Sequence, residues 1–260
     1  MSTGTFTPAP GAAPVSRMIL AQASLETRML LRNGEQLLLT VIIPSLLLVL
    51  FSAVDIIDVP VREGGSGKSV DFLAPGILAL AVLSTAFTGQ AIATGFDRRY
   101  GVLKRLGASP LPRWALMAAK TLSVLVTEVL QIALLTVIAL ALGWSPHGDP
   151  LSVAVLLLLG TAAFSGLGLL MAGTLKAEAT LAAANLVFLL LLVGGGVIVP
   201  LDKFPGAVQS VLALLPISAL SGGLREVLQH GAALPWGDAA VLAVWAVLGL
   251  GAAGRLFRWQ

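Results

Sequence analysis

Long apolar segments separated by short polar ones dominate the chain. A helix needs about 20 apolar residues to cross the hydrocarbon layer of a bilayer. Six segments are long and apolar enough, and they cover residues 36–54, 72–96, 114–142, 151–175, 180–199 and 239–256. The pattern therefore predicts an all-α integral membrane protein with six transmembrane helices.

Helical patterns also occur ahead of the first span. Residues 14–34 place Arg17 and Arg28 on one side of a helix and mostly apolar side chains on the other, and Arg32 completes the arginine set. This predicts an N-terminal helix in the membrane interface, although Glu26 falls on its apolar side. A stub without a defined function is the alternative. The Pro-rich residues 1–14 predict a disordered tail, and residues 15–258 a single transmembrane domain.

The segment between the fifth and sixth spans is too apolar for an ordinary aqueous loop. Pro205 can start a short helix that ends before Pro216, and a second helix is predicted from Ser218 to Gln229. Neither is long enough to span a bilayer, so we interpret them as two short re-entrant or outer helices. A single distorted seventh span, the alternative, would move the C-terminal arginines to the outside.

Positive charges predict the orientation, because short cytoplasmic loops retain Lys and Arg. With the N-terminus inside, 12 of the 16 basic residues are cytoplasmic, and six crossings return the C-terminus to the same side. The inner set is Arg17, Arg28, Arg32, Arg98, Arg99, Lys104, Arg105, Arg113, Lys120, Lys176, Arg255 and Arg258. This distribution accounts for the sequence pI near 9.7 without nucleic-acid binding.

Composition strengthens the prediction of a membrane protein. Apolar residues make up 57% of the 260 residues, charged residues only 11%, and the mean hydropathy is +0.95. Soluble domains carry about a quarter of charged residues. Without cysteine, and with its two histidines in predicted loops, the chain offers no disulfide, no thiolate chemistry and no evident metal or haem site in the bilayer.

Residues 62–69, REGGSGKS, end like a phosphate-binding loop. That motif requires G-x-x-x-x-G-K-S/T, and its first glycine would fall at Arg62. The stretch also lacks the strand that precedes such loops. We interpret it as a flexible Gly/Ser loop that binds no nucleotide.

A short basic helix is predicted at residues 97–107, between the second and third spans. Asp97 can cap it, Gly107 can end it, and Tyr100, Leu103 and Leu106 recur every three residues between basic side chains. Such a helix can anchor to anionic lipid or dock a soluble partner. The residues alone leave both open.

This segment resembles the cytoplasmic helix of ABC type-2 exporter permeases. The shared features are an acidic residue, a basic pair, a Gly-x-Leu-Lys-Arg-Leu run and a Ser-Pro-Leu turn. In this chain they are Asp97, Arg98, Arg99, Gly101, Leu103, Lys104, Arg105, Leu106, Ser109, Pro110 and Leu111. Residues 196–205 and 215–228, with Arg225, resemble the end of the family's fifth span and the stretch after it. The daunorubicin-resistance branch is the most similar.

The resemblance implies a permease subunit of the bacterial cell membrane with no enzyme activity or bound cofactor of its own. A separate cytoplasmic ATPase would carry ATP and Mg, and a second six-span half, a copy or a sister permease, would complete an exporter of an amphipathic drug, lipid or lipid-linked substrate. The helix with Arg17, Arg28 and Arg32 would lie beside the ATPase contact. The implied ATPase-coupling residues are Asp97, Arg98, Arg99, Tyr100, Leu103, Lys104, Arg105, Leu106, Lys176 and Glu178.

One side of the third span is polar. It carries Lys120, Ser123, Thr127, Glu128 and Gln131. An ionised acid at mid-membrane costs roughly 2.5 to 3.5 kcal/mol, so Glu128 should be protonated, partnered or in a wet cavity.

Two interpretations of this polar side follow. A structural one pairs a neutral Glu128 with Gln131 or Asn185. A functional one places these groups on a translocation path or dimer seam, formed by Ser123, Thr127, Glu128, Gln131 and Asn185. The alternative to an ABC permease is an ion-gradient carrier with Glu128 as its coupling group, although no internal repeat is evident.

Small residues predict close helix contacts, which membrane helices need in order to associate. They are Ser165, Gly168 and Ala172 in the fourth span and Gly249, Gly251 and Gly254 in the sixth. Residues 194–196, three consecutive glycines, predict either a hinge or a close-packing site.

Overall fold

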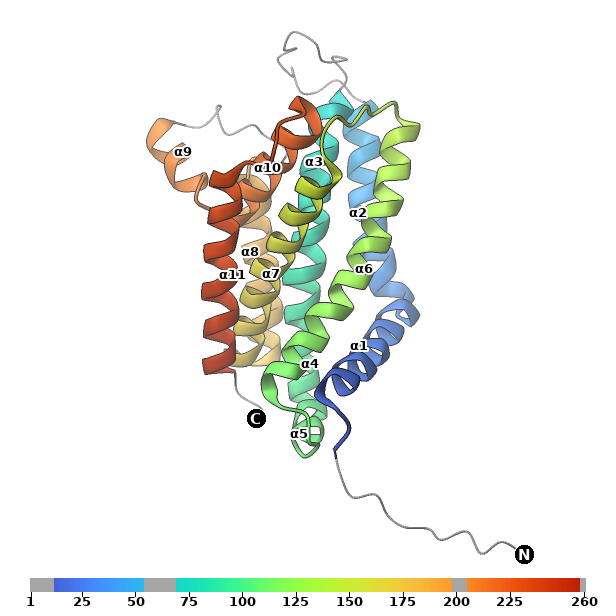
Figure 1. The fold of residues 1–260 in the computed structure, drawn as a ribbon, viewed down its shortest axis with the longest axis vertical. Helices are drawn as coiled ribbons and strands as arrows, with labels where there is room; N and C mark the ends of the chain where they lie inside the picture. Colours follow the sequence, from blue (N-terminus) through green and yellow to red (C-terminus); the bar gives the residue numbers. More distant parts are fainter. Residues whose placement is uncertain (1–11, 54–68, 198–204, 258–260) are drawn as a thin grey trace, which may run out of the picture.

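The protein is an elongated bundle of helices in the computed structural model (Figure 1), which describes residues 12–53, 69–197 and 205–257. The helices are α1 (Val15–Arg32), α2 (Gly34–Ala53), α3 (Ser69–Val82), η1 (Leu83–Gly89), α4 (Gln90–Arg99), α5 (Val102–Gly107), α6 (Arg113–Ala141), α7 (Pro150–Thr174), α8 (Ala177–Gly194), α9 (Gly206–Leu212), α10 (Pro216–His230) and α11 (Trp236–Leu256). Residues 1–11, most of the predicted tail, and residues 62–68 of the phosphate-loop-like stretch lie outside the described residues.

Within the described ranges, five helical segments are long and apolar enough to cross a membrane. They are Ser69–Arg99, Arg113–Ala141, Pro150–Thr174, Ala177–Gly194 and Trp236–Leu256. The remaining predicted span, residues 36–54 and the first along the chain, coincides with α2, whose described apolar part is the shorter stretch Thr40–Ser52 and which contains Pro44. The chain is therefore an all-helical, multi-pass membrane protein, and a count of six spans remains a prediction.

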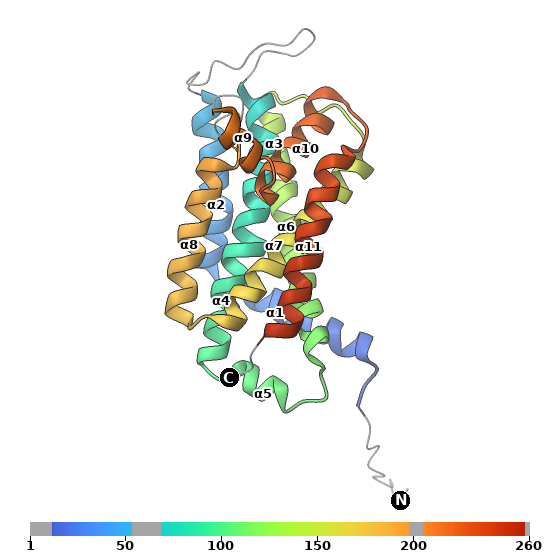
Figure 2. The ribbon, with the colours of Figure 1, turned by 90° about the vertical axis from the view of Figure 1, so that its left-hand side faces the viewer.

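The second predicted span is one long helix in three parts. α3 passes into the π-helix η1 and then into α4 without interruption, and this is the most buried of the five candidate spans. π-helical turns are rare and often mark functional sites. Helices α2, α6, α7 and α8 pack around this central helix (Figures 1 and 2).

The two ends of the bundle differ. α1, α5 and the end of α11 lie at one end, called here the inner end, while α9 and α10 lie toward the other, the outer end (Figures 1 and 2). α10 begins at Pro216, two residues before the predicted start, because proline is well tolerated in the first turn of a helix. The re-entrant placement of α9 and α10 remains a prediction.

Close helix packing depends on fewer of the predicted glycines than expected. A Cβ at Gly168 would lie 2.9 Å from the carbonyl oxygen of Phe87 in η1, and a Cβ at Gly249 would lie 3.1 Å from the backbone of Gly166 in α7. At Gly251 and Gly254, however, no described atom lies within 4 Å of the position that a Cβ would occupy, so the prediction is wrong for them. Gly166 was not among the predicted close-packing residues, although a Cβ there would lie 2.5 Å from the backbone nitrogen of Leu250 on α11.

The glycines at residues 194–196 form a packing site. A Cβ at Gly195 would lie 2.4 Å from the side chain of Ile217. Gly196 adopts a φ of 66°, which is costly for other residues and ends the helix. Of the two predictions for this stretch, close packing is the one that these contacts support.

Candidate functional site: a coupling site at the inner end

The predicted basic helix at residues 97–107 consists of two pieces. α4 continues through Asp97 to Arg99, and Gly101, with a φ of 73°, redirects the chain into α5. The prediction that Asp97 caps this helix is therefore wrong, because Asp97 lies in the last turn of α4. The predicted end at Gly107 agrees with the structure.

α5 attaches to the bundle through two apolar side chains, Leu103 and Leu106. Leu103 is fully buried in a cluster at the inner end with Leu111, Leu116 and Phe257, with Leu106 packed against it. Tyr100, Lys104 and Arg105 point to the outside instead, and Tyr100 is 68% exposed. The helix is thus anchored on one side and offers a basic and aromatic surface on the other.

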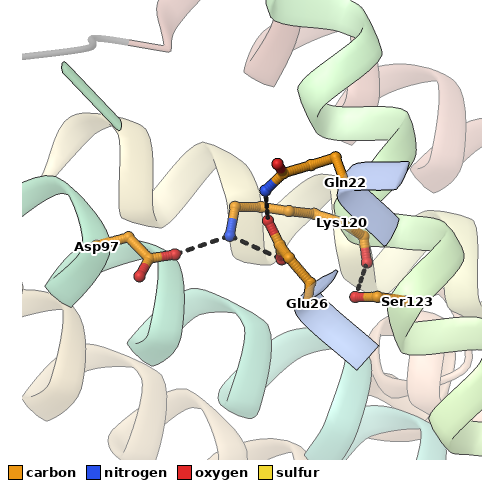
Figure 3. A network of polar contacts seen from close by, with 5 residues as sticks. All are labelled: Gln22, Glu26, Asp97, Lys120 and Ser123. Atoms are coloured by element: carbon orange, nitrogen blue, oxygen red, sulfur yellow. Dashed lines mark hydrogen bonds and ion pairs between the residues drawn. The ribbon is translucent and has the colours of Figure 1, made fainter. Parts of the chain in front are cut away.

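A buried ion-pair network joins three helices next to α5 (Figure 3). The Nζ atom of Lys120 on α6 lies 2.8 Å from Oδ2 of Asp97 on α4 and 3.0 Å from Oε2 of Glu26 on α1. Gln22 donates a hydrogen bond of 2.9 Å to the other oxygen of Glu26. The Lys120 side chain is only 4% exposed, so little water can solvate its ammonium group. The carboxylates of Glu26 and Asp97 compensate its positive charge instead.

The three charges of this network are evident in the sequence, but their pairing is not. The one available signal was that Glu26 lies on the apolar, packed side of its helix. A charge on a packed side needs a partner. Nothing in the sequence indicates that this partner lies 94 residues away.

Other contacts join the end of α4 to the α7–α8 junction. Arg99 forms an ion pair with Glu178 on α8. Arg98 donates a hydrogen bond of 2.5 Å to the carbonyl oxygen of Leu175. Lys176, exposed, precedes the first residue of α8. The structure therefore brings together the two segments predicted to contact an ATPase.

α1 presents its arginines away from the bundle. Arg17, Arg28 and Arg32 are exposed, while Ala23 on the opposite side is buried against the bundle, where α1 packs on α6. This arrangement leaves the arginines accessible at the same end as α5, where an interfacial helix is predicted to meet lipid headgroups.

The polar side of the third span is buried within the bundle. Gln131 accepts a hydrogen bond of 2.8 Å from Thr85 of η1 and donates one of 2.5 Å to the carbonyl oxygen of Thr40 on α2. Ser123 and Thr127 are also buried, and their hydroxyl groups donate to carbonyl groups of α6 itself.

The predicted partners of Glu128 are wrong. Its Oε2 atom lies 2.5 Å from the hydroxyl of Thr161 on α7. Gln131 is occupied by Thr85 and Thr40, and Asn185 is exposed and donates to the carbonyl oxygen of Leu181 on its own helix. Asn185 therefore lies apart from the other four residues predicted with it.

Arg225 connects three segments in the outer half of the bundle. Its guanidinium donates to the carbonyl oxygens of Phe72, Gly196 and Val197 at 3.2, 2.6 and 2.7 Å, and its centre lies 3.9 Å from the centroid of the Phe72 ring. A Cβ at Gly76 would lie 2.7 Å from this guanidinium and 2.6 Å from the Val197 oxygen. Arg225 thus ties α10 to the start of α3 and the end of α8.

Among the described residues, no group of three or more His, Cys, Asp or Glu side chains comes together that could hold a metal ion. The described residues thus form a multi-pass helical membrane bundle with a basic surface at one end and polar links between its helices.

Comparison with known proteins identifies the class more closely. Residues 19–228 match the model of the ABC-2 type transporter family, and the chain belongs to this family. It is 29% identical over 172 residues to the linearmycin resistance permease protein LnrN of Bacillus subtilis (strain 168), covering 66% of this chain but 44% of that protein. It is 24% identical over 235 residues to the transport permease YvfS of the same organism, covering 87% of this chain and 91% of that protein.

Proposed function

We propose that this chain is the permease subunit of an ATP-driven exporter and that a separate cytoplasmic ATPase, which binds ATP and Mg, moves it by pressing on α5. One observation carries the proposal. The end of α4, directly before α5, is tied to α6 and α1 through Lys120 and to α8 through Arg99. A displacement of α5 therefore reaches three further helices.

The mechanical argument rests on where the chain is stiff and where it bends. Leu103 holds α5 against the inner cluster, so α5 cannot move without its surroundings. Tyr100 and Gly101 form the short bend to α4. Because α4 continues into η1 and α3, a tilt imposed at the inner end is transmitted along the central helix of the bundle.

The same proposal includes the surface that the ATPase would bind. It consists of the exposed side chains of Tyr100, Lys104 and Arg105 together with Lys176 and Glu178 at the α7–α8 junction. A cleft with acidic and apolar side chains would complement it. The arginines of α1 would lie beside this cleft, at the headgroup level of the inner leaflet.

We place the chain in the bacterial cytoplasmic membrane, with α2 as the first of six spans and both termini inside, in agreement with the distribution of basic residues. A second permease half, identical or related, would complete the translocation path. α8 is the least buried of the five candidate spans, which supports its contact with lipid or with that second half.

The proposed substrate is an amphipathic compound of the drug, lipid or lipid-linked class. The resistance function in the name of one relative supports an antibiotic-like molecule. This chain spans less than half of that relative, so the substrate of the relative is not transferred to it.

The decisive experiment reconstitutes the chain into vesicles with and without a candidate ABC ATPase from the same organism. We expect ATP-dependent movement of a fluorescent amphipathic substrate only with both proteins. The variant Tyr100→Ala/Lys104→Ala/Arg105→Ala should lose ATPase co-purification and transport but keep its melting temperature, because all three side chains are exposed.

The matched control is Arg255→Ala, an exposed arginine at the same end outside the proposed contact. It should retain ATPase binding. Transport by the chain alone, or full ATPase binding by the triple variant, would contradict the proposal.

A further inference from the structure

A line of buried polar side chains runs along the central helix, and two contacts mark its limits. Thr85 of η1 bonds to Gln131 of α6 at 2.8 Å, and Asp97 of α4 pairs with Lys120 of α6 at 2.8 Å. α6 thus runs antiparallel to η1 and α4 between these contacts. At 1.5 Å per residue, the interval on α6 is about 16 Å long.

The side chains between these limits have few partners. Gln90 and Thr94 precede Asp97 by seven and three residues, which places all three along one side of α4. Gln90 is 5% and Thr94 0% exposed, and neither side chain has a hydrogen-bond partner among the described residues. Asp97 shows that this side is turned toward α6.

α7 contributes to the same region. Thr161 contacts Glu128, and Ser165, one helical turn further along α7 and fully buried, has no hydrogen-bond partner within the described chain. The second carboxyl oxygen of Glu128 is buried and unpartnered in the same sense. We call this set the polar strip, and it consists of Gln90, Thr94, Ser123, Thr127, Glu128 and Ser165.

The contacts of the Thr161 hydroxyl bear on whether Glu128 carries a proton. The hydroxyl of Thr161 has one hydrogen but two oxygen neighbours, Oε2 of Glu128 at 2.5 Å and the carbonyl oxygen of Leu157 at 2.8 Å. A carbonyl oxygen cannot donate. In the structure, the Thr161 hydroxyl is the donor toward both oxygens. If Glu128 were protonated, its carboxyl group would donate to Thr161 and leave the Thr161 hydrogen for Leu157, so both contacts would be satisfied.

Unpartnered groups are expensive inside a protein. A buried donor or acceptor without a partner is costly, and native interiors avoid this cost with protein groups or ordered water. Four polar side chains with unpartnered atoms among the described residues, Gln90, Thr94, Glu128 and Ser165, lie on α4, α6 and α7. Water molecules bridging such groups typically make about three hydrogen bonds each.

We propose that the polar strip holds a chain of ordered water that connects Glu128 with the inner end, and that Glu128 exchanges its proton with the inner aqueous phase along it. This goes beyond the proposed export function, since it requires neither substrate nor ATPase. Each water or hydroxyl group accepts one proton and passes on another, so a proton leaving Glu128 is replaced by one from the inner side.

The ionisable side chains around Glu128 favour proton exchange toward the inner end of the bundle. η1, α7 and the described apolar part of α2 contain no ionisable side chain, and Asp71 of α3 and Asp238 of α11 lie near the outer ends of their helices. Lys120, Asp97 and Glu26 stand at the inner end of the strip. Toward the outer side, Gln131 is occupied at both ends of its amide group.

Infrared spectroscopy of the full chain in lipid nanodiscs tests the proposal. The carbonyl band of the Glu128 carboxylic acid is assigned by its loss in Glu128→Gln. On transfer to D2O we expect this band to shift at once in the unaltered chain. In Thr94→Val and in Gln90→Leu the shift should slow by about tenfold or more, because an apolar side chain interrupts the water chain.

Two controls separate this from general destabilisation. Thr94→Ser keeps the hydroxyl and should exchange like the unaltered chain. Ser218→Ala removes a buried hydroxyl, unpartnered among the described residues, from α10 at the outer end and should do the same. Absence of a Glu128 carboxylic acid band, no shift in the unaltered chain, or unchanged rates in correctly folded Thr94→Val and Gln90→Leu would each overturn the proposal.

Discussion

Removing the ammonium of Lys120 should be among the most damaging single changes in this protein. Lys120→Met keeps the length and apolar stem of the side chain but leaves two carboxylates, on Asp97 and Glu26, without a counter-charge. Breaking a buried pair in this way costs about 3 to 5 kcal/mol. The carboxylates are 32% and 16% exposed, so partial hydration favours the lower limit, about 3 kcal/mol.

The expected loss in the free energy of unfolding comes from the unpaired carboxylates of Asp97 and Glu26 and not from lost packing. This distinction can be tested. The triple variant Lys120→Met/Glu26→Gln/Asp97→Asn removes all three charges at nearly constant volume. It should recover to within about 1 kcal/mol of the unaltered chain, because replacing a whole buried ion network is often neutral or stabilising.

The assay is the equilibrium unfolding of purified protein in mixed micelles, followed by circular dichroism. Glu26→Gln and Asp97→Asn alone complete the cycle and give the coupling energy of each pair. Loss of less than about 0.5 kcal/mol in Lys120→Met, or no recovery in the triple variant, would show that this network does not hold α1, α4 and α6 together.

Three further predictions follow from single sites. Gly76→Ala should cost about 1 to 3 kcal/mol in the same unfolding assay, because its Cβ would lie 2.6 Å from a carbonyl oxygen, whereas Gly251→Ala, with open space around it, should be neutral or stabilising. Glu128→Gln should lower export while the complex with the ATPase still assembles; unchanged export would leave Glu128 a structural role only. Hydrogen bonds from Leu151 and Ser152 lower the pKa of Asp149, so its contribution is present above the unfolded pKa of about 4 and is lost as pH falls through the lower folded value. Melting curves of Asp149→Asn and the unaltered chain should therefore converge in acid, and a constant difference would argue against this cap.

The sequence-based predictions for Asp97 and Glu128 were wrong for the same physical reason. Asp97 has the residue type and position of a helix cap, yet α4 continues past it to Arg99, and Asp97 pairs with Lys120 on α6. Glu128 has Gln131 within reach along its own helix, yet its partner is Thr161 on α7. In both cases a local rule competed with contacts between helices, and the contacts between helices prevailed.

What the sequence determined by itself is the class of molecule and its two ends. Apolar segment length predicts where helices can cross a bilayer, and five candidate spans coincide with those segments. Clustered basic residues predicted one cytoplasmic end, and α1 and α5, which carry several of them, lie at the same end of the bundle (Figure 1). These properties depend on transfer of whole segments between water and lipid, and transfer free energies sum along the chain without reference to tertiary contacts.

Only the tertiary structure decided which charged and polar groups meet. Lys120 and Glu26 are 94 residues apart, and Arg225 and Phe72 are separated by 153. Their pairing depends on the angle and rotation with which helices pack. Small residues such as Gly166 and Gly249 set these by allowing close approach at particular points, and that information resides in pairs of surfaces and not in any single helix.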